Sequence, residues 1–67
     1  MSVAKTIEIS ASSTESFDDA VKQGIARASK TIDGIREAWV KEQKVTVENN
    51  QLSEFRVHMM VTFVLKE

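Results

Sequence analysis

The chain has 67 residues with no cysteine, one histidine and a formal net charge of −1 at pH 7. This length allows one domain, residues 1–67, and excludes a second. The missing cysteines exclude disulfides and thiolate zinc sites, and the balanced charge argues against nucleic-acid or membrane partners. With no apolar run long enough to span a bilayer, we expect a soluble, cytoplasmic protein.

Residues 3–11 alternate between apolar and polar side chains. Thr6, Glu8 and Ser10 lie on one side of this segment. The residues on the other side are Val3, Lys5, Ile7, Ile9 and Ala11. This period of two predicts a half-buried strand.

Residues 12–35 change to the period of an amphipathic helix. The apolar stripe is formed by Phe17, Ala20, Val21, Gly24, Ile25, Ala28, Ile32 and Ile35. Ser12 with Glu15 fits a capping box, although Ser13 is an equally good N-cap. Gly34 fits the position just after a helix end. We therefore expect a helix of roughly 21 residues, about 32 Å long.

Two long strands are expected on either side of Asn49 and Asn50, which tolerate the positive φ angles of a tight hairpin turn. In the last strand the apolar face holds Phe55, Val57, Met59, Val61, Phe63 and Leu65. Its other face holds Glu54, Arg56, His58, Met60, Thr62 and Val64. In the middle strand Ala38 and Val40 fall in one phase but Val45 and Val47 in the other, so we expect a bulge between Lys41 and Lys44.

The element order predicts an α+β fold: strand–helix–strand–strand, with a three-stranded antiparallel-type sheet of order 1-3-2 packed on one helix. A strand of about 14 residues spans roughly 46 Å, so the strands extend beyond the helix. Small domains without disulfides or structural metals often gain stability from neighbouring subunits. The overhanging strands therefore predict a homo-oligomer.

The segments "ASSTESFDDAV", "IARASKTI", "WVKEQ" and "VTFVL" occur in this order over nearly the whole chain. In order and spacing they resemble the dodecin family. Dodecins are small strand–helix–strand–strand proteins that assemble as twelve-subunit hollow shells and commonly hold flavins. The resemblance implies a homododecamer with FMN or riboflavin as its ligand.

Flavin-binding dodecins carry a tryptophan that stacks on the flavin and a glutamine that hydrogen-bonds it. By the same resemblance these positions fall on Glu37 and Arg56 here. Glu37 cannot stack on a ring, and Arg56 offers donors but no acceptor. A branch of the family without this pair also keeps an arginine in the last strand and has been associated with calcium. The chain is similar to that branch at Arg56, Glu42 and Gln43.

The candidate ligand-binding residues are Trp39, Glu37, Arg56, His58 and Gln43. Trp39 is expected to be buried between subunits, where tryptophan is enriched, to stack on a planar ligand, or to remain a surface ring. Arg56 pairs with Glu37 or Glu54, or binds a phosphate. His58 is expected to be a hydrogen-bonded interface residue rather than a ligand contact.

Other chemistry has little support in the sequence. Calcium needs several converging oxygen ligands, and no EF-hand spacing occurs. The candidates by residue type are Glu8, Glu42, Glu48, Asn49 and Asn50. No glycine-rich phosphate loop or nucleophile elbow is present, so we expect no enzyme. The first functional hypothesis is flavin storage, and the alternative is an assembly without flavin that has a structural or calcium-binding role.

Overall fold

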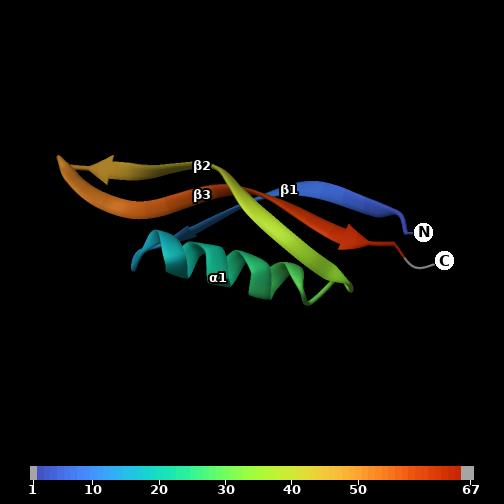
Figure 1. The fold of residues 1–67 in the computed structure, drawn as a ribbon. Coiled ribbons are helices and arrows are strands. Elements are labelled where there is room, and N and C mark those ends of the chain that lie inside the picture. Colours follow the sequence, from blue (N-terminus) through green and yellow to red (C-terminus); the bar gives the residue numbers. More distant parts are fainter. Residues whose placement is uncertain (1, 66–67) are drawn as a thin grey trace.

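The computed structural model describes residues 2–65, which form one helix against a sheet (Figure 1). In chain order the elements are β1 (Ala4–Ser13), α1 (Phe17–Ala28), β2 (Ile35–Glu48) and β3 (Gln51–Val64). Both outer strands run antiparallel to β3, giving the sheet order β1-β3-β2. The predicted fold class and strand order are confirmed.

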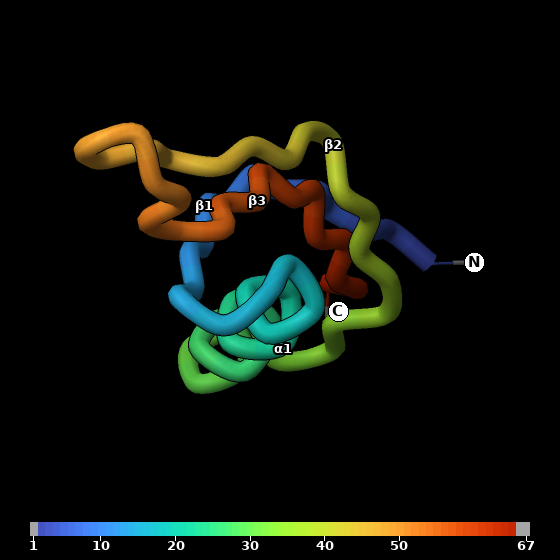
Figure 2. The backbone as a smooth tube through the Cα atoms, turned by 90° about the vertical axis from the view of Figure 1, so that its left-hand side faces the viewer, coloured from blue at the N-terminus to red at the C-terminus, as the bar shows by residue number. Residues whose placement is uncertain are grey.

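The core lies between α1 and the two strands β1 and β3, and Figure 2 shows the helix beneath them. Val57, Met59 and Val61 of β3 are fully buried, as is Ala20 of α1. The partly buried residues packed around this core are Ile9, Ala11, Phe17 and Val21. The ring of Phe17 meets that of Phe55 edge-on, with centroids 5.1 Å apart. The predicted apolar faces of the helix and of the last strand therefore do meet.

The helix is shorter than predicted and begins later. Its N-cap is Ser16, whose hydroxyl accepts a hydrogen bond from the Asp19 amide at 2.9 Å. The expected caps Ser12 and Ser13 are wrong, because both residues are still paired with β3. The Ser13 hydroxyl instead donates to the Asp19 carboxylate at 2.6 Å and accepts from the Glu15 amide at 2.9 Å.

The predicted helix end was also wrong. The helix ends at Ala28, with Ser29 as its C-cap, and residues 29–31 continue only as turns. Gly34 is not the residue after the helix; with φ +77° it instead turns the chain into β2. The Val64 amide donates to the Gly34 carbonyl at 3.0 Å and fixes this turn against the end of β3.

The hairpin turn between β2 and β3 is formed by Asn49 and Asn50, with φ angles of 52° and 63°. Two consecutive positive φ angles are those of a type I′ turn, whose twist matches paired strands. This prediction is confirmed. In Figure 1 the hairpin end extends past the start of α1 and has no helix beneath it.

The register between β2 and β3 shifts at three places, and one lies between Val40 and Glu42. This shift makes Lys41 an extra residue at the start of the interval where a bulge was predicted. It brings Val40 and Val45 to the same face, since they pair with Met59 and Phe55. The shifts next to Ile35 and Thr46 were not predicted.

Gly24 allows α1 to approach the sheet closely. A Cβ atom built there would lie 2.5 Å from Met59 Cε and 3.1 Å from Ala11 Cβ. The glycine in the predicted helical stripe therefore has a packing function. Among residues 2–65, no helix is long and apolar enough to cross a membrane.

Candidate ligand-binding face

The sheet face turned away from α1 collects most of the predicted site residues, and we call it the open face. Its side chains form four rows across β1, β3 and β2, because residues directly opposite one another in a sheet point to the same side. The rows are Thr6 with Thr62 and Glu37; Glu8 with Met60 and Trp39; Ser10 with His58 and Glu42; and Ser12 with Arg56 and Lys44.

Trp39 lies within the open face, and 50% of its surface is exposed. It is in register with Met60, and Glu8 lies beyond Met60 on β1. An indole presents a large, rigid apolar surface with a single donor at its edge. In one subunit nothing in residues 2–65 fully covers this ring, so it is available to a partner subunit or to a planar ligand.

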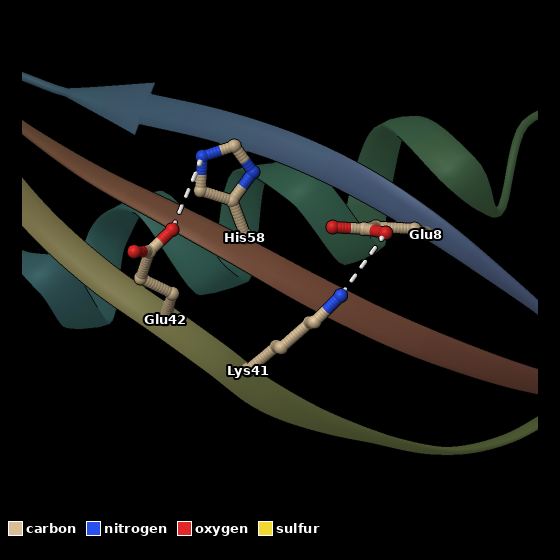
Figure 3. A network of polar contacts seen from close by, with 4 residues as sticks. All are labelled: Glu8, Lys41, Glu42 and His58. Atoms are coloured by element: carbon tan, nitrogen blue, oxygen red, sulfur yellow. Dashed lines mark ion pairs between the residues drawn. The ribbon is translucent and has the colours of Figure 1, made fainter.

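Two ion pairs on the open face involve Glu8, in the row of Trp39, and Glu42, in the next row. Figure 3 shows the four side chains that form them. Lys41 Nζ lies 3.6 Å from Glu8 Oε1, and His58 Nε2 lies 3.9 Å from Glu42 Oε1. Lys41 reaches Glu8 from the bulge in β2, so this pair connects the two outer strands across β3. The histidine contact is too long for a strong hydrogen bond and is an ion pair only when His58 is protonated. Exposed pairs of this kind add little stability, so their effect is mainly on the charge around Trp39.

Arg56 lies on the open face two rows away from Trp39. Its Nη2 donates to Glu54 Oε1 at 3.2 Å. Glu54 is thus a partner, as expected, but the pair forms within β3 and not across strands or between subunits. Lys44 of β2 is in register with Arg56. The row with Lys44 and Arg56 therefore holds two basic groups, although Glu54 offsets the charge of Arg56. Glu37 and Glu8 lie toward the opposite end, where Lys41 offsets the charge of Glu8.

Four of the five predicted residues share this face: Glu37, Trp39, Arg56 and His58. Gln43 does not, since it is in register with the buried Val57 and so points to the helix side. Sequence reasoning missed Lys44 and the Lys41 contact with Glu8. Neither follows from alternation alone. Without the register shift between Thr46 and Val47, the two-residue turn would place Gln43 rather than Lys44 opposite Arg56, and the Lys41 contact depends on the bulge.

The described residues 2–65 contain no group of three histidine, aspartate or glutamate side chains placed to hold a metal ion. The carboxylates of Glu8, Glu37 and Glu42 lie on the open face but in three different rows. A calcium ion prefers six to eight oxygen ligands. A calcium site on this face would therefore need carboxylates from more than one copy of the chain.

Comparison with known proteins by sequence points to one family. The Dodecin family model matches residues 3–66. A protein named calcium dodecin from Mycobacterium tuberculosis is 33% identical over 66 residues, which cover 98% of this chain and 93% of that protein.

Solved structures agree with this match. A dodecin from Streptomyces davaonensis has a TM-score of 0.94 at 30% identity, covering 98% of this chain and 97% of that one. A protein from Thermus thermophilus also has a TM-score of 0.94, at 31% identity, covering 100% and 98%. Calcium dodecin of Mycobacterium tuberculosis, described as calcium chelating with a novel calcium-binding site, has a TM-score of 0.86 at 31% identity, covering 96% and 91%.

Proposed function

Because the chain belongs to the dodecin family, we propose that it is a self-assembling binding protein that stores riboflavin or FMN between its subunits. The family resemblance implies a shell of twelve copies. The observation that carries the proposal is Trp39, a half-exposed indole on an otherwise largely polar sheet face. The proposal assigns binding residues and no catalytic ones.

Stacking is the main interaction in this proposal. Offset stacking of aromatic rings contributes about 0.5–1.5 kcal/mol beyond the burial of their area. Trp39 would hold one face of the flavin ring, and a second subunit would cover the other. Enclosed in this way, the photoreactive ring of a stored flavin is withheld from solvent. Glu37 occupies the position expected for the stacking residue, so Trp39 takes that role from the same side of the strand.

The charged residues of the open face suggest how bound FMN would be oriented along the strands. Arg56 and Lys44 lie about 13 Å along the strands from the row of Trp39, at roughly 3.3 Å per residue. Guanidinium and ammonium groups are the usual partners of phosphate. We therefore expect the ring at Trp39 and the phosphate toward Arg56 and Lys44, away from Glu37.

The test is a titration of the purified protein with riboflavin and with FMN, followed by quenching of Trp39 fluorescence. We expect quenching by both flavins. In Arg56→Ala, FMN should bind about tenfold more weakly, the equivalent of about 1.4 kcal/mol, while riboflavin binding changes little. Thr6→Ala, on the far strand of the same face, is the matched control. If neither flavin quenches Trp39, flavin storage is ruled out.

A second candidate is calcium binding, supported by the relative named calcium dodecin. The end of the open face with Glu8 and Glu37 would supply carboxylates from two or more copies. We expect added calcium to raise the melting temperature and a chelator to reverse the rise, since a ligand that binds only the folded state stabilises it. Glu37→Gln should remove the effect, and Glu15→Gln, outside the sheet, should not. An unchanged melting temperature would exclude this candidate.

A further inference from the structure

Trp39 is the only tryptophan of the chain, and acidic side chains lie around it on the open face. Glu37 precedes it by two residues on the same side of β2, about 7 Å along the strand. Glu8 lies in the row of Trp39, and Glu42 lies in the next row. The indole therefore has one carboxylate in its own row and one in each of the two adjacent rows.

Only one of these carboxylates has a permanently charged partner in the described part of the chain. Lys41 Nζ lies 3.6 Å from Glu8 Oε1. Glu42 faces His58 at 3.9 Å, and this contact offsets its charge only when the imidazole is protonated. Among the described residues no basic side chain forms an ion pair with Glu37. With His58 neutral, this part of the open face thus carries an excess of negative charge.

The spacing of the carboxylates suits a bulky cation better than a metal ion. Among the described residues no three such side chains are placed to hold a metal. A quaternary ammonium group has no need of close oxygen ligands, because it binds over the face of an indole, within about 6 Å of the ring centroid. The ring of Trp39 is 50% exposed and can accept such a group. Carboxylates beyond the rim of the ring then attract the cation without coordinating it.

The chain itself already places one cation in this region. Lys41 is the extra residue of the bulge in β2, and Figure 3 shows its side chain extended toward Glu8. This side chain is 59% exposed, and an exposed ion pair is weak and easily exchanged. The ammonium group of Lys41 therefore acts as a tethered competitor that a ligand cation can replace.

We propose that the open face around Trp39 binds a small organic cation with a quaternary ammonium group. The cation lies over the indole face, Glu37 and Glu42 supply the compensating charge, and Lys41 competes for Glu8. This site is a second use of Trp39 and does not depend on flavin storage. A flavin ring stacked on Trp39 blocks it.

Choline and its neutral isostere 3,3-dimethylbutan-1-ol give the first test, because they share a shape and differ in charge. Trp39 fluorescence reports on this site alone, since the chain has no other tryptophan. We expect saturable choline binding in the millimolar range, and binding of the alcohol about fivefold weaker. Sodium chloride should weaken choline binding, since it screens exposed charges. Equal binding of the two compounds, or no binding of choline, would overturn the cation site.

Two charge variants should have opposite effects. Glu37→Gln should weaken choline binding about threefold, as expected for one charge about 7 Å away in water. Lys41→Met removes the competing ammonium group and should strengthen binding by a similar factor. Glu15→Gln, outside the sheet, is the matched control and should change nothing. A general loss of folding cannot produce both a gain and a loss, and weaker binding in Lys41→Met would contradict the proposed competition.

The contribution of the ring is tested separately. Trp39→Phe keeps an aromatic face, whereas Trp39→Leu keeps only apolar bulk. Broadening of the choline methyl signal in NMR spectra follows binding without the indole. We expect the phenylalanine variant to retain part of the binding and the leucine variant to lose it. Equal binding by both variants would show that the aromatic face does not hold the cation.

Discussion

Strands β3 and β2 have the same length and are paired throughout, yet their burial is very different. In β3, Val57, Met59 and Val61 point to the helix side and are fully buried. In β2 no residue is buried, and Val40 and Val45, on the same side of the sheet, remain 42% and 41% exposed. The alternation of side chains alone does not decide which of them form the core.

The difference follows from the reach of α1. A helix of 12 residues is about 18 Å long, whereas strands of 14 residues span about 46 Å. The helix covers β1 and part of β3. It does not cover the helix-side face of β2 or of the hairpin end. One subunit therefore completes only part of its sheet, and the rest is surface for another copy or for a ligand.

The largest effect is expected where the helix covers the sheet. Met59→Ala should lower the free energy of unfolding by about 2–5 kcal/mol, since it leaves a cavity in the core. The control is Met60→Ala, the next residue on the open face, which should cost much less. Chemical denaturation at one fixed protein concentration measures both. Equal losses for the two variants would contradict the difference between the two faces.

A substitution in the hairpin end, which α1 does not cover, should affect subunit association more than the stability of a single subunit. Val47→Ser should weaken subunit association tenfold or more, because full burial of a valine is worth about 1.5–3 kcal/mol. Unfolding of the dissociated subunit should change little. Sedimentation at several dilutions separates the two effects. Val3→Ser, similarly exposed but outside the hairpin end, serves as the control; if it weakens association as strongly, the hairpin end has no special role.

Gly24 tests how closely α1 lies on the sheet. Alanine in an exposed helix stabilises by about 1 kcal/mol relative to glycine, but here the new methyl group would meet Met59 and Ala11. Overpacking costs about 1–3 kcal/mol, so Gly24→Ala should give a net loss of about 1 kcal/mol in a denaturation experiment. A gain in stability would mean that the helix does not approach the sheet as closely as described.

The smallest effect concerns the start of α1. Ser16→Ala removes the N-cap hydrogen bond to the Asp19 amide and should cost about 1 kcal/mol or slightly less. Thr14→Ala, in the same exposed loop, is the control and should be nearly neutral. Thermal unfolding distinguishes them, and a larger loss for the Thr14 variant would contradict the observed helix start.

The sequence predicted those features that depend on local patterns. Alternation identified β3 and its buried face, and the Asn49–Asn50 pair identified the hairpin turn. The helix limits could not be predicted, because the stripe runs past Ala28 to Ile32 and Ile35, and because Ser13 looks like a cap although it ends β1. Local pattern does not show which apolar residues a helix reaches.

The candidate site was predicted in part for the same reason. Four residues share the open face because alternation within each strand placed them there. The phase of Gln43 follows from the bulge at Lys41, whose position the sequence indicated only within an interval. The contact between Lys41 and Glu8 joins strands far apart in sequence, and no local pattern contains it.

The most direct test of the central claim is the mass of the natural protein in solution, measured by sedimentation equilibrium over a range of concentrations. Self-assembly predicts a stable species whose mass is a whole multiple of 7.5 kDa, and the family resemblance implies twelve copies. A well-folded species of 7.5 kDa at all concentrations would contradict it. The exposed face of β2 and the half-exposed Trp39 would then belong to a complete monomer.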